Sequence, residues 1–93
     1  MWNSDYQLLS RLWTRDNRIA ELAWRDGKLY FAQHAADDIE CHCDERAVEV
    51  AKVEDAPQQE TQILESASYD QLYILSGDRA FRSRCRGERW EEI

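Results

Sequence analysis

The sequence predicts an α+β domain that is mainly antiparallel β, with an N-terminal helix packed on a β-meander. Three observations support this class: a length of 93 residues that suits one domain, an Asp-Gly turn between two apolar runs, and apolar residues at helical spacing near the N-terminus. The expected single domain 1–93 divides into an N-terminal helix 1–17, a first β unit 18–53, a loop 54–61 and a second β unit 62–93.

The helix is predicted over residues 4–17. Ser4 is a suitable N-cap, and Gln7 three residues later completes a capping box. One broad helical face then carries the apolar residues Tyr6, Leu8, Leu9, Leu12 and Trp13. A strand over residues 6–13 is the competing interpretation.

The strands are predicted from alternation and turn residues. Residues 18–24 and 28–33 flank Arg25-Asp26-Gly27, and Asp-Gly supplies the positive φ angles of a tight hairpin turn. The single proline marks the loop 54–61. Turns are expected at residues 69–70 and 77–78, and further strands at residues 39–43, 47–53, 62–68, 71–76, 80–85 and 89–93.

An internal repeat offers an alternative fold. Arg18–Ala23 aligns with Gln62–Ala67, and Leu29–Ala32 with Leu72–Leu75, at an offset of 43 to 44 residues. A period near 40 residues with about four strands each is typical of propeller blades. The alternative is therefore an all-β two-blade propeller-like unit that closes by oligomerisation, for example as three copies. We favour the helix on a meander because its signal is at least as good.

The C-terminal third carries a motif-like pattern. Tyr73 lies on an expected strand, and Ser83, Gly87 and Trp90 follow at the spacing of S-x-D-x-G-x-x-W. This pattern resembles the Asp-box repeat of sialidase-type β-propellers, with Cys85 in place of the aspartate. The resemblance covers residues 62–93 well and 18–50 loosely. In that family the box is structural and lies away from the active site, so the resemblance implies no catalytic role.

Composition indicates a folded, acidic protein. Nineteen acidic against twelve basic residues give a net charge of −7, and the mean hydropathy is −0.78. Aromatic residues make up 11%, which favours a folded chain over a disordered one. The sequence contains no apolar run of the roughly 20 residues that cross a bilayer and no recognisable signal peptide. Three cysteines do not suit a disulfide framework, so we expect a cytoplasmic location.

Catalytic and metal chemistry are not predicted. Cys41, His42 and Cys43, with His34 and Cys85, are zinc-ligand types, but one residue between the cysteines is not the spacing of a zinc knuckle. A strand would also place His42 opposite the two cysteines. We therefore expect no metal, no cofactor and no catalytic residue. The acidic stretch lacks the glycine of a calcium-binding EF-hand loop.

Charge is segregated along the chain. Residues 30–77 hold eleven acids and two bases, whereas residues 78–89 hold five arginines and two acids. On a strand, Arg82, Arg84 and Arg86 would form a ladder on one face, opposite in sign to Glu40 and Asp44 of the aligned repeat. Such a surface favours a protein partner, and a net charge of −7 argues against direct nucleic-acid binding.

These patterns predict a small non-enzymatic protein–protein interaction module that assembles with itself or docks on a protein partner. The alternative is an acidic inhibitor, phage-borne or antitoxin-like in composition, that mimics nucleic acid and blocks a nucleic-acid-binding enzyme. A third hypothesis is a carbohydrate-binding blade pair in which Trp24 and Trp90 stack on sugar. Trp2 is expected to be exposed. No membrane partner is expected, and the candidate partner-binding residues are Trp2, Tyr6, Arg82, Arg84, Arg86, Asp37, Asp38, Glu40, Asp44 and Glu45.

Overall fold

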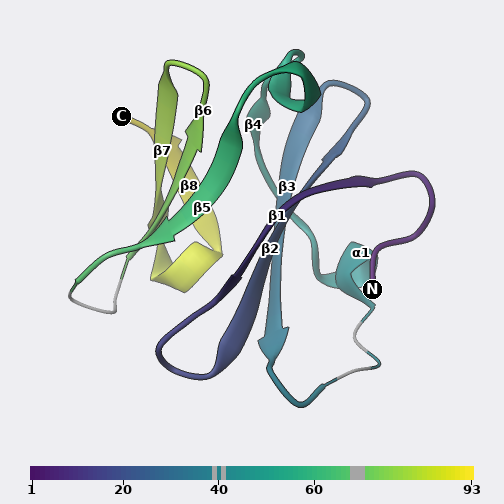
Figure 1. Ribbon diagram of the computed structural model, residues 1–93, viewed down its shortest axis with the longest axis vertical. Helices are drawn as coiled ribbons and strands as arrows, with labels where there is room; N and C mark the ends of the chain where they lie inside the picture. Colours follow the sequence, from purple (N-terminus) through teal and green to yellow (C-terminus); the bar gives the residue numbers. More distant parts are fainter. Residues whose placement is uncertain (39, 41, 68–70) are drawn as a thin grey trace.

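Two four-stranded antiparallel sheets make up the chain (Figure 1). The computed structural model describes residues 1–38, 40, 42–67 and 71–93. Sheet A has the order β1 (Gln7–Trp13), β2 (Arg18–Arg25), β3 (Lys28–Ala35), β4 (Val48–Lys52), and sheet B the order β5 (Thr61–Glu65), β6 (Leu72–Ser76), β7 (Arg79–Arg84), β8 (Arg89–Glu92). The short helical turns are α1 (Cys43–Arg46), η1 (Ala56–Gln58) and η2 (Cys85–Gly87). The prediction of a mainly antiparallel β protein is confirmed.

The β2–β3 hairpin forms as predicted. Asp26 and Gly27 take φ angles of 50° and 83°, the left-handed pair that a two-residue hairpin turn requires. The turn fixes the register, which runs without a shift from Arg25 opposite Lys28 to Arg18 opposite Ala35. This hairpin positions every side chain on the two central strands of sheet A.

The predicted N-terminal helix is wrong, because residues 7–13 form strand β1 along β2. The pairing register shifts between Leu8 and Ser10, so that Leu9 is an extra residue in a β-bulge. Because of the bulge, Leu9 and Leu12 both pack against the core although they are three residues apart. Three-residue spacing is also the spacing of a helix face, and this explains the incorrect interpretation.

The remaining predictions differ mainly around the turns. The strand expected at residues 39–43 includes positions 39 and 41, which lie outside the described residues, and Cys43 begins α1 instead. The turn at residues 69–70 also lies outside the described part. Cys85 leaves β7 for η2, where Cys85 and Arg86 have positive φ angles of 53° and 55°. Strands β4, β6, β7 and β8 lie within about one residue of their predicted positions, whereas β5 ends at Glu65, three residues before the predicted end.

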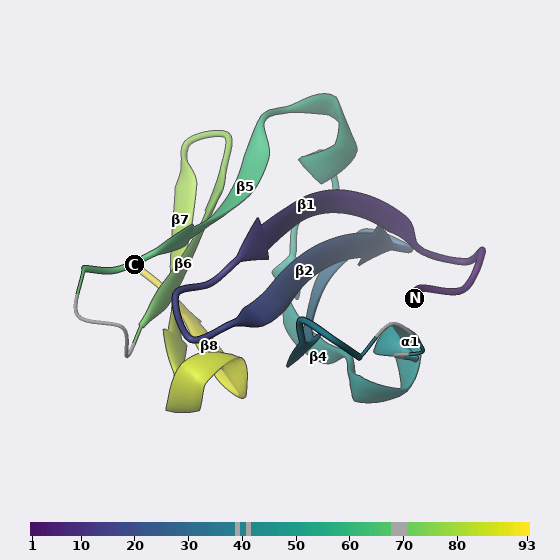
Figure 2. The same cartoon turned by 60° about the horizontal axis from the view of Figure 1, so that its bottom comes forward.

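The core lies between the two sheets. The inner face of sheet A contributes Ala20, Leu22, Leu29 and Phe31, and that of sheet B contributes Ile63, Leu72, Ile74 and Phe81, all at most 4% exposed. Strand β1 contacts β5, and β4 contacts β8, so corresponding edges of the two meanders lie together. The aligned repeat segments occupy β2 and β5 rather than equivalent strands, so the repeat as aligned is one strand out of step. Each sheet therefore turns an outer face away from the other (Figure 2).

Candidate functional site

The outer face of sheet A is covered by the chain's own N-terminal segment and by α1. Trp2 packs on a small second core made of Ala32 and Cys43, and its ring lies 5.0 Å from that of Tyr6. The Tyr6 ring in turn meets Tyr30 edge-on at 5.4 Å. Trp2 is therefore half-buried, contrary to the prediction that it is exposed; Trp13, at 67%, is far more exposed.

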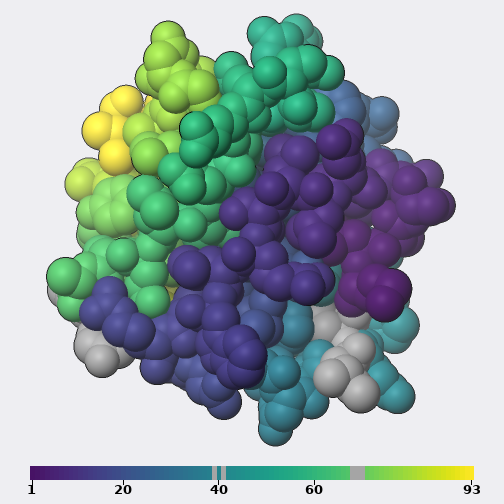
Figure 3. Space-filling model, viewed as in Figure 1, coloured from purple at the N-terminus to yellow at the C-terminus, as the bar shows by residue number. Residues whose placement is uncertain are grey.

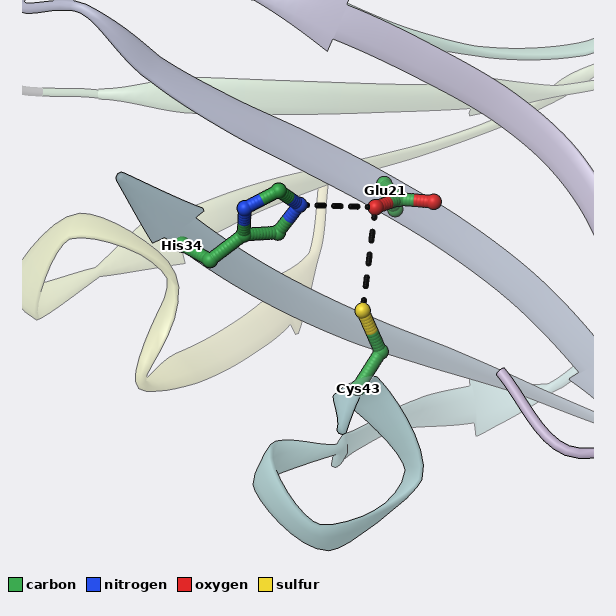
Figure 4. A group of neighbouring side chains, drawn as sticks. All are labelled: Glu21, His34 and Cys43. Carbon is green, nitrogen blue, oxygen red and sulfur yellow. Dashed lines mark hydrogen bonds and ion pairs between the residues drawn. The ribbon is translucent and has the colours of Figure 1, made fainter. Parts of the chain in front are cut away.

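Under this cover, Glu21, His34 and Cys43 come together from three different elements (Figure 4). The Glu21 carboxylate lies 3.0 Å from His34 Nε2 and accepts a hydrogen bond from Cys43 Sγ at 3.7 Å. Glu21 is 3% exposed and Cys43 is fully buried. The Met1 amino group donates to the same sulfur at 3.4 Å. A buried acid, an imidazole and a thiol thus share one point on the sheet.

The cluster is held electrostatically. Burial raises the pKa of the Glu21 carboxyl, but the hydrogen bond from His34 and the nearby charge of Arg11 outweigh burial and leave the pKa below its ordinary value. Arg11 Nη2 lies 3.4 Å from Glu21 at the exposed side of the cluster. Glu21 is therefore a buried carboxylate whose charge is stabilised by a hydrogen bond and by the nearby guanidinium of Arg11.

A hollow of about 400 Å³ lies over this cluster. Its lining combines the polar residues Glu21, His34 and Arg11 with apolar side chains. The complete lining is Met1, Trp2, Tyr6, Leu8, Arg11, Ile19, Glu21, His34 and Asp38. A mainly apolar lining with a few convergent polar groups is typical of sites for small ligands.

The predicted acidic residues lie in the segment that follows β3 and in α1, and one of them, Asp38, lines the hollow. We call Asp37, Asp38, Glu40, Asp44 and Glu45 the acidic end; the α1 part lies on the side of sheet A away from sheet B (Figure 1). Asn3 donates to Asp44 at 3.0 Å, and Arg46 lies 3.5 Å from Asp38. Asp37, Glu40 and Glu45 are exposed. Because Asp44 lies in α1, the predicted strand ladder of Glu40, His42 and Asp44 does not form.

The arginine ladder forms in part, on the opposite side of the molecule. Arg82 and Arg84 lie on the outer face of sheet B, and both donate to Glu91 of β8, at 2.6 Å and 2.9 Å. These hydrogen bonds, the one from Arg82 above all, hold the pKa of the Glu91 carboxyl below its ordinary value. Arg89 lies on the same face, opposite Arg84. We call Arg82, Arg84, Arg89 and Glu91 the basic face.

Arg86 does not belong to the ladder. The turn at η2 directs its guanidinium to Asp16 Oδ2, 3.0 Å away in the β1–β2 loop. Gln33 Nε2 donates to the backbone carbonyl of Arg86 at 2.7 Å. Arg86 therefore connects the two sheets, and its predicted place beside Arg82 and Arg84 is wrong because the strand ends at Arg84.

The outer face of sheet B also carries apolar side chains. The register places Leu64, Tyr73, Leu75 and Ala80 on this face, beside the basic face. Leu64 is 40% exposed, and the other three are partly exposed. Within the described residues, no strand or helical turn packs on this surface as α1 and the N-terminal segment pack on sheet A. Figure 3 shows the two halves of the chain side by side on the surface, the first purple and blue, the second green and yellow.

Two tryptophans that were candidates for sugar stacking serve the packing between the sheets. Trp24 Nε1 donates to the Val53 carbonyl at 3.0 Å, and Trp90 Nε1 donates to the Gly87 carbonyl at 3.0 Å. The Trp90 ring also packs 5.2 Å from Phe31 of the core.

Sequence reasoning missed Glu21, although a signal for it exists. The Asp26-Gly27 turn fixes the hairpin register, and this register places Glu21 opposite Ala32, diagonally adjacent to His34 on the same face. A single glutamate between Ala20 and Leu22, with a histidine at that diagonal position, indicates a buried polar pair. Cys43 could not be added from sequence, because α1 reaches the sheet only through tertiary packing.

The fold and these sites define a small two-sheet antiparallel β protein with a buried Glu–His–Cys cluster and outer faces of opposite charge. No protein-family model, curated protein or solved structure matches the chain. Within the described residues there is no helix with the length and apolar character needed to cross a membrane.

Proposed function

We propose that this chain is a protein–protein interaction module that assembles with further copies of itself. The observation that carries the proposal is the outer face of sheet B, on which no described strand or helical turn packs. On this face Leu64, Tyr73 and Leu75 lie beside three arginines and one glutamate. Partly exposed apolar and aromatic side chains beside arginine are the composition of interface centres. The opposite outer face, on sheet A, is already occupied by the chain itself.

Charge complementarity favours a second copy as the occupant. The basic face is a positive area on a chain whose net charge is −7, so the rest of each copy presents an acidic surface. The acidic end belongs to sheet A's side of the molecule, and the basic face to sheet B's side. A contact between the basic face of one copy and the acidic end of the next is head-to-tail, and such contacts close into rings or continue as filaments. Three copies would join six four-stranded sheets, within the roughly four to eight blades of closed propellers.

The dimensions of the face predict a weak contact. Four strands spaced about 4.8 Å apart, with about five residues each at about 3.4 Å, give a flat area on the order of 300 Å². A stable interface buries about 800 Å² per partner, so assembly should depend on concentration and on charge. Salt at about 1 M, where the screening length falls to about 3 Å, should weaken it.

Analytical ultracentrifugation of the wild type and of an R82E/R84E variant tests the proposal. The wild type should gain mass with concentration at low salt, and R82E/R84E should associate roughly 10- to 100-fold more weakly because attraction becomes repulsion. A K28E/K52E variant is the matched control: its charge change is identical, but both lysines lie on sheet A. A wild type that stays monomeric at every concentration, or equal weakening by both variants, would contradict the proposal.

The second candidate is the acidic inhibitor, which the exposed Asp37, Glu40 and Glu45 at one end of the molecule favour. Such an inhibitor acts as a monomer and releases a basic enzyme when salt screens the charges. Under this alternative, E40K/E45K would abolish capture of a nucleic-acid-binding enzyme, whereas R82E/R84E would leave capture unchanged. The two functions are therefore distinguished by which end of the molecule is needed.

A further inference from the structure

We propose that Glu21, His34 and Cys43 bind a divalent transition-metal ion, zinc in particular. Each residue offers one ligand atom, and the three atoms lie within 4.8 Å of one another. Carboxylate oxygen, imidazole nitrogen and thiolate sulfur are the three ligand types that zinc uses in proteins. The ligands come from β2, β3 and the first residue of α1, so two of the three stand on a rigid hairpin.

The distances fit a tetrahedral ion. With metal bonds of about 2.0–2.1 Å to nitrogen and oxygen and about 2.3 Å to sulfur, tetrahedral edges are about 3.4 Å for nitrogen to oxygen and about 3.6 Å for oxygen to sulfur. The corresponding distances are 3.0 Å from His34 Nε2 to Glu21 and 3.7 Å from Cys43 Sγ to Glu21. Shifts of a few tenths of an ångström in these two edges would admit the ion. The remaining edge, from His34 to Cys43, is at most 4.8 Å and must shorten toward the tetrahedral value of about 3.6 Å when the ion binds.

The hydrogen bonds of His34 also fit the role of a metal ligand. His34 Nδ1 lies 2.9 Å from the Ala35 carbonyl, which can only accept, so Nδ1 carries a hydrogen. Nε2 lies 3.0 Å from the Glu21 carboxylate, and a metal ion bound by both would take the place of the proton in that hydrogen bond. A metal-binding histidine usually donates its other ring N–H to a carbonyl or carboxylate, as Nδ1 does here to Ala35.

The charges balance when zinc is bound. A Cys43 thiolate, a Glu21 carboxylate and a neutral His34 carry two negative charges, which the divalent ion cancels. Arg11 and the Met1 amino group, each 3.4 Å from the cluster, belong to exposed residues whose charges water can solvate. On binding, the thiol proton and any imidazolium proton go to solvent. The hollow reaches Glu21 and His34, so water can occupy a fourth position. Such a site would also fix the position of α1, which carries Asp44 and Glu45 of the acidic end. Metal binding does not require the chain to assemble with other copies.

The test is titration of chelator-treated protein with Co²⁺ alone, followed by displacement with Zn²⁺. Tetrahedral cobalt with a thiolate ligand gives visible d–d bands and a sulfur-to-metal charge-transfer band. The wild type should bind about one ion per chain, and saturating zinc should raise the thermal midpoint by roughly 10 to 20 °C. Affinity should fall with falling pH because protons compete for the ligands.

Variants separate this site from adventitious binding. C43S should remove the charge-transfer band. Loss of a residue that only hydrogen-bonds to a metal ligand weakens metal binding roughly 10–100-fold. E21Q and H34Q remove ligands themselves, so each should weaken metal binding by more than that. The matched controls C85S and H42A change the same residue types at exposed positions and should bind like the wild type. Circular dichroism identifies any variant that does not fold. H34Q changes the most exposed of the three ligands and retains a hydrogen-bonding side chain, so we expect it to fold. Equal metal content in the wild type and in folded C43S or H34Q, or no cobalt spectrum in the wild type, would overturn the proposal.

Discussion

Replacing Gly87 with alanine should weaken the contact between the two sheets. Gly87 lies in η2 at a φ angle of +100°, which L-residues rarely adopt, and the strain alone costs about 1–2 kcal/mol. An added Cβ would lie 2.4 Å from Phe31 Cε2 and 2.9 Å from Cζ, against an ordinary contact of about 3.5–4.0 Å. Phe31 is 1% exposed and packs against Trp90, so its ring cannot retreat. Overpacking adds about 1–3 kcal/mol.

The sum for G87A is a loss of about 2–5 kcal/mol, a large part of the roughly 5–15 kcal/mol that holds a small domain folded. A Cβ at Gly27 meets only Glu54 Cγ at an ordinary 3.5 Å, and the φ angle there is +83°. G27A therefore carries strain without the clash and is the control. Urea unfolding followed by tryptophan fluorescence should show G87A losing about 1–3 kcal/mol more than G27A. Equal losses would refute the close approach of η2 to the Phe31 ring.

Three further predictions concern single side chains. Because the folded state holds the pKa of Glu21 below its ordinary value of 4.5, the unfolded state takes up the proton first as pH falls. The free energy of unfolding of the wild type, relative to that of E21Q, should therefore be constant above about pH 6 and should decrease toward pH 3. Urea unfolding across this pH range measures the difference. A difference that stays constant down to pH 3 would argue against the ion pairs of Glu21. Ser83 Oγ accepts a hydrogen bond from the buried backbone N–H of Leu72 at 2.9 Å, so S83A should cost about 1–3 kcal/mol and speed amide exchange at Leu72; unchanged exchange would contradict this bond. In a C41S variant without added metal, a thiol reagent should modify the exposed Cys85 rapidly and the buried Cys43 only when the protein unfolds. Rapid modification of both thiols would contradict the burial of Cys43.

The hairpin is the part of the fold that sequence reasoning reached most directly. Asp26 and Gly27 specify a local geometry, and that geometry sets the β2–β3 register without help from the rest of the chain. For β4 to β8, apolar runs between turn residues gave approximate positions and no registers, and the β3–β4 pairing contains a shift between Leu29 and Tyr30.

Strand β1 could not be assigned in this way. Its bulge at Leu9 changes the two-residue period, and the resulting spacing of apolar side chains equals that of a helix. Residues 7–13 form a strand because they pair with β2, and this tertiary interaction outweighs their local helix propensity. The end of β7 was misjudged for a related reason: positive φ angles at Cys85 and Arg86 are not signalled by their residue types. Arg86 consequently contacts Asp16 instead of joining the ladder.

The candidate sites likewise include residues that the sequence predicts and residues that it does not. Arg82 and Arg84 follow from alternation along one strand, and the structure places them on one face. The cluster of Glu21, His34 and Cys43 joins two strands and a helical turn, and only the hairpin register gives part of it in advance. Cysteine spacing directed attention to Cys41 and Cys43 as a pair, whereas Cys43 contacts Glu21, which is distant in sequence.

Head-to-tail assembly joins the basic face of one copy to the acidic end of the next, and mixing two charge-reversed variants isolates this contact. R82E/R84E loses the basic face, and E40K/E45K reverses two exposed positions of the acidic end. We predict that at low salt each variant alone sediments as a monomer and that an equimolar mixture forms a complex, because each supplies the surface the other lacks. If the mixture sediments as two non-interacting monomers while the wild type associates, the contact is not the one proposed here.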